Sequence, residues 1–365
     1  MKSLKKMRIK QLELKQFRNV EDVSLDFPEN ITVFVGNNGQ GKTNIIESIV
    51  FLGSGRSFRV NDDKILIQNG KEFAKVEAVM DSGHLLKIVV SEQGKYLQVN
   101  HSPLKKLSDF IGYCNVILFN PDDLNFFTDA PKIRRRSVDF ELGKLSKDYI
   151  GILSRYTQVL TQRNALLKSR NIDFSLLEIL DSRLIEYQIP IIKQRNAFIA
   201  RLEPVVERFY QAMSQTSTRV NFEYRSPVSV DSSILANLTK RMQEMHQRDL
   251  DIRATQVGIH RDDYVFKMDG VPVINTASQG QKRMLMIAFK LALVSLVYEL
   301  QGAYPILCLD DLFSELDESR RKMVLKMIPD AVQVFITTTD MQFIQTERNL
   351  NVFHVNKGII HKEVI

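Results

Sequence analysis

One segment constrains the fold of this chain more than any other. An apolar run, Val33 to Val35, leads directly into the loop GNNGQGKT at residues 36–43, and a helical pattern follows. The loop fits the spacing G-x-x-x-x-G-K-[ST], and a strand before it with a helix after it is the context that separates this motif from a chance glycine-rich turn. The segment therefore predicts the strand–loop–helix unit of a nucleotide-binding α/β domain.

The residue types of this loop suit the binding of phosphate. Glycines let the backbone turn its N–H groups inward, and the start of the helix adds partial positive charge. In such a loop Lys42 reaches the β- and γ-phosphates of ATP, and the Thr43 hydroxyl binds Mg²⁺. The expected nucleotide-binding residues are Gly36, Asn37, Asn38, Gly39, Gln40, Gly41, Lys42 and Thr43.

A second apolar run ends in two carboxylates. Residues 306–309 predict a buried strand, and Asp310 and Asp311 follow it. Alone, two such acids could form a solvent-exposed turn. Beside a phosphate-binding loop, we expect Asp310 to join Thr43 in binding Mg²⁺ and Asp311 to orient or deprotonate the attacking water. Lys42, Asp310 and Asp311 are therefore the candidate catalytic residues.

Hydrophobic periodicity divides the rest of the chain. Alternating apolar residues predict an antiparallel layer of strands over 7–35 and 73–100. Helical spacing dominates over 121–250, where Pro190 and Pro204 are expected to kink or break the helices. We therefore expect an α/β lobe with a mixed sheet and an antiparallel layer, interrupted by a mostly helical lobe. The expected ranges are 1–120 and 251–365 for the α/β lobe and 121–250 for the helical lobe.

A polar, glycine-bearing tip precedes one of the most apolar helical patterns in the chain. Residues 275–283 read NTASQGQKR, and the apolar pattern runs from Met284 to Leu300. The tip has no thiol, no metal-ligand cluster and no acid/base pair. Ser278 and Gly280 can cap the helix, and a helix start with free N–H groups also suits an anion. The residues alone leave both interpretations open.

The charge balance favours a polyanionic partner. The chain of 365 residues has a net charge of +7 and a pI near 9.2. Lys and Arg gather in the first eighteen residues, at Arg56 and Arg59, and over Lys132 to Arg136. Such runs are usually solvated surface, and the last of them could instead pair with the acids of VDFEL or with nucleotide.

The cysteines and apolar segments suggest a compartment. Cys114 and Cys308 lie in apolar surroundings, as expected of core residues in a reducing environment. The N-terminus lacks the continuous apolar run of a secretory signal. The longest apolar stretch, MLMIAFKLALVSLV, contains Lys290 and is expected to be too short to span a bilayer. We therefore expect a cytoplasmic protein without a membrane partner.

Taken together, these segments resemble the RecF family, bacterial recombination and repair proteins with an ABC-type ATPase head of the SMC kind. The phosphate loop, SQGQKR, LDDLFSELD and VFITTTD occur in the order that ABC-type heads use. The finer match lies in FRNV, GNNGQGKTN, GRSFR, PDDL, RRRSVDFEL, QRNALLK, GIHRDD and ASQGQKR. These segments run from about residue 12 to 340, so the resemblance covers nearly the whole chain.

The resemblance implies a function. RecF-like proteins have an ATPase lobe and a helical lobe without long coiled-coil arms, and they dimerise through ATP. They bind double-stranded DNA and gapped single-strand/double-strand junctions, and they work with RecO and RecR to load RecA. Their ATP hydrolysis is slow and depends on DNA. Since the sequence shows neither zinc-finger spacing nor a clear recognition helix, we expect contacts to the DNA backbone without base readout.

The resemblance also implies roles for individual residues. Ser278, Gly280 and Gln281 correspond to the ABC signature loop, which contacts the γ-phosphate of ATP bound to the partner copy. This would explain a second anion-facing helix start in a chain with one phosphate loop. Asp317 corresponds to the D-loop, and Asp122-Asp123 lie where the Q-loop joins the lobes.

The sequence departs from the ABC pattern in three places. Asp311 stands where ABC transporters have Glu, which fits slow turnover. The switch His is absent, and FITTTD offers Thr337 to Asp340 instead. The family segment GPHRDD reads GIHRDD here, which changes the stiffness of that loop.

Three alternatives to a DNA-dependent ATPase remain open. An SMC-like structural head needs a long arm, which an insert of about 130 residues cannot supply in both directions. A transporter ATPase predicts a switch His and the spelling LSGGQ, and neither is present. A non-hydrolysing, ATP-gated DNA clamp would differ from an ATPase in being insensitive to substitution of Asp311.

Overall fold

The chain forms two compact units. The computed structural model describes residues 7–363, and its units are Met1–Asp123 with Met286–Ile365 (unit 1) and Leu124–Leu285 (unit 2). We expected the inserted lobe to end at residue 250, but residues 251–285 cluster with it. The reason is a strand pair, because β10 (Asp263–Met268) pairs along its length with β9 (Val220–Arg225), a strand that the helical periodicity around it concealed.

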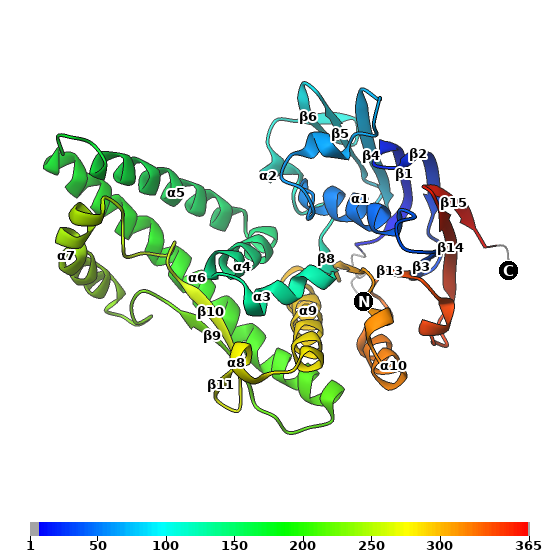
Figure 1. The fold of residues 1–365 in the computed structure, drawn as a ribbon. Coiled ribbons are helices and arrows are strands. Elements are labelled where there is room, and N and C mark those ends of the chain that lie inside the picture. The colour runs from blue at the N-terminus through cyan, green and yellow to red at the C-terminus, as the bar shows by residue number, and fades with distance from the viewer. Residues whose placement is uncertain (1–6, 364–365) are drawn as a thin grey trace. The chain divides into compact units, whose positions relative to one another are not determined.

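Two six-stranded sheets frame unit 1 (Figure 1). The first is antiparallel, in the order β2-β1-β4-β5-β6-β7. The second has the order β15-β14-β3-β13-β12-β8 and is parallel except for the β14–β15 hairpin. The strands are β1 Ile9–Phe17, β2 Val20–Asp26, β3 Ile31–Val35, β4 Phe73–Met80, β5 Leu85–Ser91, β6 Gly94–Val99, β7 Ser102–Leu104, β8 Val116–Phe119, β12 Ile306–Leu309, β13 Val334–Thr338, β14 Leu350–Asn356 and β15 Ile359–Lys362.

Helix α1 (Lys42–Ser54) lies between these two sheets (Figure 1). Ile45, Ile46, Ile49 and Leu52 are fully buried in a core to which both sheets contribute. A helix that is apolar on most of its circumference must be covered on most sides. Because β3 enters the phosphate loop and α1 leaves it, this packing fixes the direction in which the loop faces.

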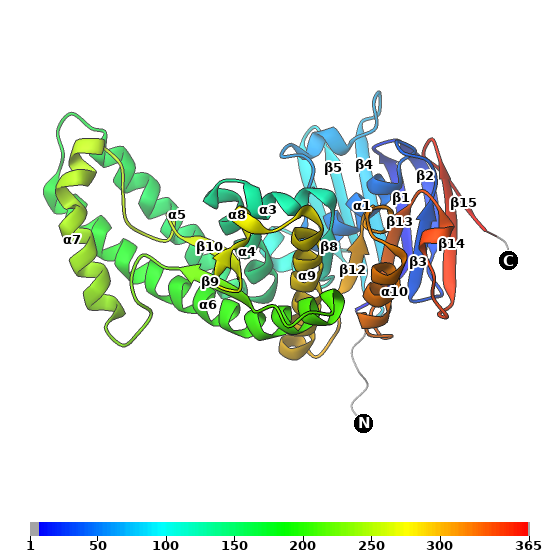
Figure 2. The ribbon, with the colours of Figure 1, turned by 60° about the horizontal axis from the view of Figure 1, so that its bottom comes forward.

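The remaining helices of unit 1 lie across the parallel sheet from α1 (Figures 1 and 2). They are α10 (Glu318–Met327) and the part of α9 (Gln279–Gln301) that follows Leu285. The short α2 (Leu107–Phe110) and four 3₁₀ turns complete the unit: η1 Asp63–Leu66, η2 Pro121–Leu124, η3 Phe313–Glu315 and η4 Met341–Phe343.

Helix α9 corrects one expectation from the sequence. With 23 residues it is long and apolar enough to pass as a membrane span by length and composition, although we expected the apolar stretch to be too short. In the fold, 72% of its most apolar window is buried inside the protein. This burial is what the core helix of a folded domain requires.

Unit 2 is mainly helical, with a small antiparallel sheet in the order β11-β10-β9. Its elements are α3 Asn125–Thr128, α4 Pro131–Leu145, α5 Lys147–Leu167, α6 Phe174–Ser214, α7 Ile234–Ile252, β11 Val271–Pro272 and α8 Val273–Thr276. We expected Pro190 and Pro204 to kink or break the helices, but α6 runs through both. Each proline frees the carbonyl four residues earlier, at Glu186 and Ala200, and both of these residues are exposed, so water can satisfy the freed carbonyls.

The lysine inside the apolar helix α9 has a specific partner. Lys290 is 9% exposed, and its Nζ lies 2.8 Å from Asp123 Oδ1. The other carboxylate oxygen of Asp123 accepts the backbone N–H of Asn120 at 2.8 Å. A buried charge is tolerated when it is paired and hydrogen-bonded, so this ion pair allows α9 to be buried with a cation in its middle.

This ion pair predicts an asymmetry between two substitutions. Asp123→Ala leaves the Lys290 ammonium buried without its carboxylate, and we expect a loss of about 2 kcal/mol in the free energy of unfolding. Lys290→Met removes the charge and keeps the apolar stem, so we expect a change within about 1 kcal/mol. Urea denaturation of both variants measures the difference, and equal losses would contradict the assignment.

Candidate functional site

The phosphate loop has the backbone geometry that its glycines predict. Gly39 and Gly41 have φ of 78° and 112°, in the region that favours glycine. A Cβ on Gly36 would lie 2.3 Å from the carbonyl oxygen of Val355 in β14, so this position has no room for a side chain. The loop therefore needs glycine at all three positions, twice for backbone conformation and once for space.

The side chain of Lys42 is hydrogen-bonded to the backbone of the loop that precedes it. Its Nζ donates to the carbonyl oxygens of Gly36 at 2.6 Å and Asn37 at 2.9 Å. Partial burial lowers the pKa of Lys42, and the carboxylates of Asp311 and Asp310 oppose this shift. The ammonium group thus lies between the loop carbonyls and the acids, where the β- and γ-phosphates are expected.

Gln40 is fixed by residues far away in the sequence. Its carbonyl oxygen accepts the N–H of Gly358 at 2.9 Å and the side-chain amide of Asn19 at 3.1 Å. Its own Oε1 accepts the N–H of Lys357 at 2.8 Å. Gln40 is expected to contact nucleotide, and its side chain also ties the loop to the turn between β14 and β15. Asn19, in FRNV, is a supporting residue that the motif search did not single out.

The two expected Mg²⁺ ligands meet at the end of β12. Thr43 Oγ1 donates to Asp310 Oδ1 at 3.1 Å, and Asp310 is 4% exposed. Burial raises the pKa of Asp310, an effect that a bound cation would reverse. Mg²⁺ prefers a few protein oxygens together with substrate phosphates, and this donor pair fits that preference. Over residues 7–363, no cluster of three or more His, Cys, Asp or Glu offers an alternative metal site.

Asp311 has a strained backbone. Its φ is 50°, unusual for a residue other than glycine, and such outliers concentrate at functional sites. The Ser314 hydroxyl lies 3.0 Å from both the carbonyl oxygen and Oδ1 of Asp311. The N–H of Asp311 donates to the hydroxyl of Thr337 at 2.8 Å, and Thr337 also donates to Asp310. The sequence alone predicted no separate role for Thr337, which appeared only within FITTTD, the segment that lacks a switch His.

The SQGQ tip is a capped helix start in unit 2. The N–H of Gln281 donates to Ser278 Oγ at 3.2 Å, and the N–H of Ser278 donates to Gln281 Oε1 at 2.8 Å. This reciprocal pair is a capping box at the start of α9. Both side chains are exposed, and the Cβ position of Gly280 is open except for Ser278 Oγ at 4.0 Å. The cap interpretation is therefore correct, and it leaves an accessible tip.

Two further acids that the sequence singled out have structural partners. Asp123 pairs with Lys290, as described above. The side chain of Asp317 accepts the N–H of Arg320 at 2.9 Å and so caps α10. The structure thus gives both carboxylates a role in fixing local backbone.

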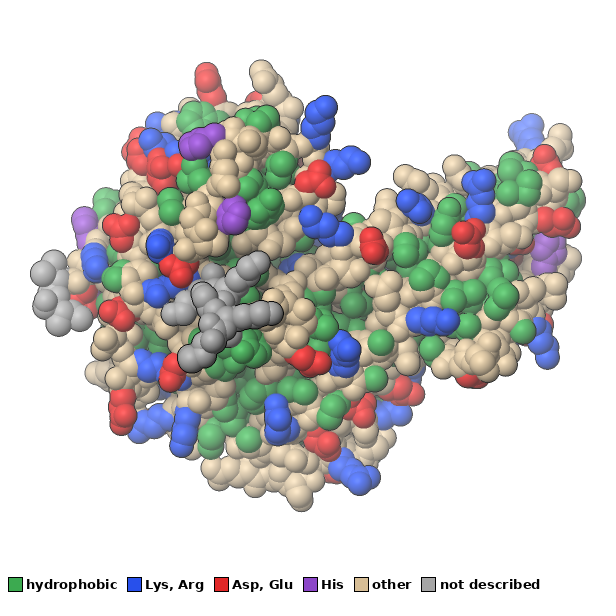
Figure 3. All heavy atoms as spheres, turned by 180° about the vertical axis from the view of Figure 1, so that it is seen from behind, with side chains coloured by type: hydrophobic (Ala, Val, Ile, Leu, Met, Phe, Trp, Pro, Cys, Tyr) green, Lys and Arg blue, Asp and Glu red, His purple; other side chains and the backbone are tan. Residues whose placement is uncertain are grey.

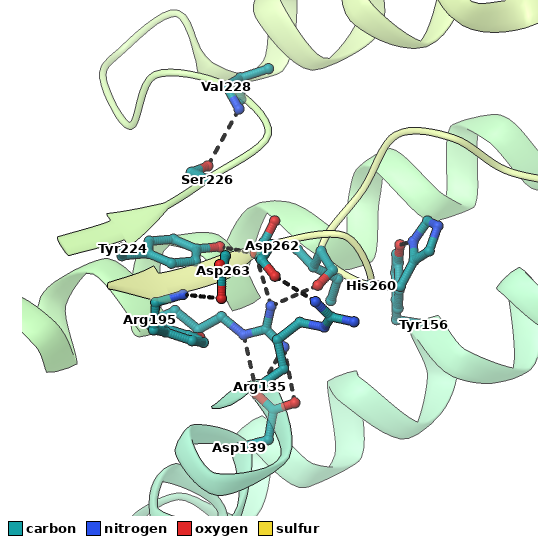
Figure 4. Close-up of polar contacts among 12 residues, drawn as sticks. Arg135, Asp139, Tyr156, Arg195, Tyr224, Ser226, Val228, His260, Asp262 and Asp263 are labelled. Carbon is teal, nitrogen blue, oxygen red and sulfur yellow. Dashed lines mark hydrogen bonds and ion pairs between the residues drawn. The ribbon is translucent and has the colours of Figure 1, made fainter. Parts of the chain in front are cut away.

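Two of the four basic residues after Pro131, Arg134 and Arg135, are engaged in contacts within the protein. Arg134 forms two bonds with Asp263, at 2.6 and 2.9 Å, and Arg135 donates to the carbonyl of Asp262 at 2.6 Å. Figure 4 shows Arg135, Asp262 and Asp263 close together within unit 2. Lys132 and Arg136 remain exposed on α4. The run is therefore divided between internal ion pairs and solvent, as the alternation of helix faces requires.

The centre of this network is Arg195 of α6, which is almost fully buried. It donates to both carboxylate oxygens of Asp139 at 2.8 and 3.0 Å, and to Asp262 at 2.9 Å (Figure 4). Tyr224 donates a short hydrogen bond to the same Asp262. VDFEL supplies Asp139 and GIHRDD supplies Asp262, so two of the segments quoted for the resemblance contribute acids to this buried network.

The basic residues on the face seen in Figure 3 form no continuous field among the described residues. Arg59 donates to Asn44 at 2.7 Å and pairs with the buried Glu47, while Arg56 is exposed. On the face seen in Figure 3, Lys and Arg side chains are interspersed with acidic and apolar ones. Of the basic N-terminal run, Lys2, Lys5 and Lys6 lie outside the described residues. The structure therefore identifies no DNA surface by charge alone.

The buried network predicts a pH dependence of stability. Burial raises the pKa of Asp262 to about 6, against the opposing effect of Arg195. A carboxyl group whose pKa is raised by folding stabilises the fold below its unfolded pKa and loses that contribution as pH rises through about 6. We therefore expect Asp262→Asn to gain stability relative to the wild type between about pH 4 and 7, by on the order of 1–3 kcal/mol.

The measurement is urea denaturation at each pH, with Glu178→Gln as control. Glu178 is an exposed carboxylate on α6, so its substitution should give a nearly constant difference. A constant difference for Asp262→Asn as well would contradict a raised pKa for this buried group.

The chain is similar to known proteins over nearly its whole length. Residues 8–361 match the family model described as the RecF/RecN/SMC N terminal domain. The chain is 38% identical to the DNA replication and repair protein RecF of Streptococcus agalactiae serotype V over 361 residues, covering 97% of this chain and 98% of the relative. It is 37% identical to the protein of that name from Listeria welshimeri over 369 residues, covering 98% and 100%.

Solved structures show the same relationship. The structure of the recombination mediator protein RecF with ATP in the RecFOR pathway superposes with a TM-score of 0.91 at 30% identity, covering 100% of this chain and 99% of that one. The Smc head domain of Pyrococcus furiosus superposes with a TM-score of 0.59 at 16% identity, covering 98% and 96%, a likeness of fold alone.

Proposed function

The chain belongs to the RecF family, and on this premise we propose that it is an ATP-dependent recombination mediator that dimerises around ATP and binds DNA. One observation carries the proposal. Thr43 and Asp310 meet beside a complete phosphate loop, at 3.1 Å, as an ATP·Mg²⁺ site requires. The resemblance to RecF with ATP supports ATP as the nucleotide.

Each residue of the site has a proposed task. The backbone N–H groups of residues 36–43 bind the phosphates, and Lys42 moves from the carbonyls of the loop to the β- and γ-phosphates. Thr43 and Asp310 hold Mg²⁺, which neutralises charge on the phosphates during phosphoryl transfer. Asp311 orients the attacking water. Because Asp is shorter than the Glu of ABC transporters, we expect slow hydrolysis that DNA stimulates.

The second phosphate contact comes from another copy of the chain. The capped tip at Ser278, Gly280 and Gln281 is exposed, and the apolar side chains of Val271 and Ile274 beside it are 43% and 52% exposed. Exposed apolar side chains next to an anion-binding helix start suit a surface that is covered on dimerisation. We therefore propose a two-fold homodimer in which each tip contacts the γ-phosphate of ATP bound to the partner copy.

The biological partners follow from the family. We propose that the ATP-bound dimer binds double-stranded DNA and gapped single-strand/double-strand junctions in the cytoplasm, and that it acts with RecO and RecR to load RecA. The net charge of +7 supports contacts to DNA phosphates. A non-hydrolysing clamp is the second candidate, favoured by the strained Asp311 and by the lack of a switch His.

Substitution of Asp311 separates the two candidates. Asp311→Asn preserves size and the hydrogen bonds from Ser314 but removes the base, so an ATPase should lose DNA-stimulated turnover by about 10²-fold and keep ATP binding. Phosphate release and nucleotide titration measure the two quantities. Lys42→Ala serves as the control that loses binding as well. Unchanged turnover in Asp311→Asn would contradict the assigned role.

Mixing two inactive variants tests the composite site. Ser278→Arg spoils the tip and Lys42→Ala spoils the loop, so each homodimer should be inactive. In an equal mixture half of the dimers are mixed, and each mixed dimer has one intact site of two, so we expect about a quarter of wild-type ATPase activity. Activity no higher than that of the separate variants would contradict sites shared between copies, provided that light scattering shows dimers with ATP.

A further inference from the structure

Thr337 joins the two candidate acids. It is the second-last residue of β13 and is 1% exposed. Its hydroxyl donates to Asp310 Oδ1 at 2.7 Å and accepts the N–H of Asp311 at 2.8 Å. A hydroxyl has one proton and two lone pairs, so a single side chain can hold both neighbours at once.

These bonds orient Asp310. Thr43 and Thr337 donate to the same oxygen, Oδ1. Within residues 7–363 no hydrogen bond or ion pair reaches Oδ2. Two donors on one oxygen restrict the carboxylate to one orientation and leave the other oxygen for a further ligand. That division suits a carboxylate that must present one oxygen toward the cation and its waters.

The second bond supports the strained residue. Asp311 has a φ of 50°, and backbone in this region persists only when its surroundings fix it. The hydroxyl of Thr337 accepts the hydrogen bond from the N–H of Asp311. It takes the place of the backbone carbonyl that would accept this bond in a regular strand. Thr337 therefore fixes the direction in which the Asp311 carboxylate leaves the chain.

The position of β13 connects this arrangement to the phosphate loop. In the sheet, β13 lies between β3, which enters the loop, and β12, which carries the acids. The next residue, Thr338, accepts the N–H of Gly36 at its carbonyl oxygen, at 3.2 Å. One strand end thus bonds to the first residue of the loop and to both acids. Two adjacent residues, Thr337 and Thr338, thus link the loop to Asp310 and Asp311.

We propose that Thr337 is a positioning residue for Mg²⁺ binding and water attack, in the place where ABC-type heads have a switch His. The proposal rests on the proposed function of the same site. It assigns Thr337 no contact with nucleotide, because its one hydroxyl is already engaged by the two acids. Its effect should therefore appear in the metal dependence and the turnover, while ATP affinity at saturating Mg²⁺ changes little.

The test uses three substitutions at Thr337. Thr337→Val keeps the shape but removes both bonds, so we expect DNA-stimulated turnover to fall about 10-fold and the Mg²⁺ concentration at half-maximal ATP binding to rise several-fold. Thr337→Ser keeps the hydroxyl and should restore both quantities to within about 2-fold. Thr337→Ala leaves space for a bridging water and carries the test if the valine variant does not fold.

A matched control lies on the neighbouring strand. Thr32 of β3 is fully buried and pairs in register with Phe335, and its hydroxyl has no hydrogen-bond partner among residues 7–363. Thr32→Val should therefore leave both turnover and the Mg²⁺ requirement unchanged. A general loss of stability in the sheet would affect both valine variants, whereas a positioning role affects only Thr337→Val.

The outcomes separate this proposal from the function on which it rests. Valine and alanine variants with wild-type turnover and an unchanged Mg²⁺ requirement would overturn the role of Thr337, while active wild-type protein would leave the proposed ATPase intact. A serine variant as impaired as the valine variant would also overturn it. If the wild type binds ATP but does not hydrolyse it, Mg²⁺-dependent nucleotide binding replaces turnover as the readout. Wild-type protein that fails to bind ATP would refute the proposed function itself.

Discussion

The burial of α1 between two sheets is the constraint on which the nucleotide site depends. An isolated helix of thirteen residues is marginal in water, so α1 owes its stability to apolar packing on both sides. Ile45, Ile46 and Ile49 are fully buried in this core. The helix cannot rotate or slide without exposing these side chains. Its N-terminus therefore keeps a fixed position at the phosphate loop. The loop, Lys42 and Thr43 inherit their position from that packing.

The parts of the site that sequence alone could predict are those with local causes. The glycine spacing, the strand before it and the helix after it lie within about twenty residues, and each has a direct physical meaning. The same holds for the cap at Ser278, where the S-x-x-Q spacing brings two side chains onto one helical turn. The acids after β12 were predictable because a short apolar run ended in them.

The remaining parts depend on partners far along the chain. Gln40 looks like a loop residue until Lys357 and Gly358 are placed beside it. Arg134 and Arg135 look like a basic surface until β10 brings Asp262 and Asp263 to α4. The periodicity of a single sequence carries no information on such distant pairs. For the same reason it did not predict the pairing of β9 with β10, and the inserted unit ends at residue 285 where we expected 250. The hydrogen-bond partners of Gln40, Arg134 and Arg135 are thus brought to them by strands distant in the sequence.

The bond between Gln40 and the β14–β15 turn has a consequence for how the protein is made. The phosphate loop leaves the ribosome early, but the backbone that braces it at Lys357 follows 317 residues later. Unit 2 is one continuous stretch, so it can fold while unit 1 still lacks four strands of its parallel sheet. A truncated or prematurely released chain should therefore contain a folded helical unit without a nucleotide-competent one. The phosphate loop thus stays unbraced until β14 and β15 have been made.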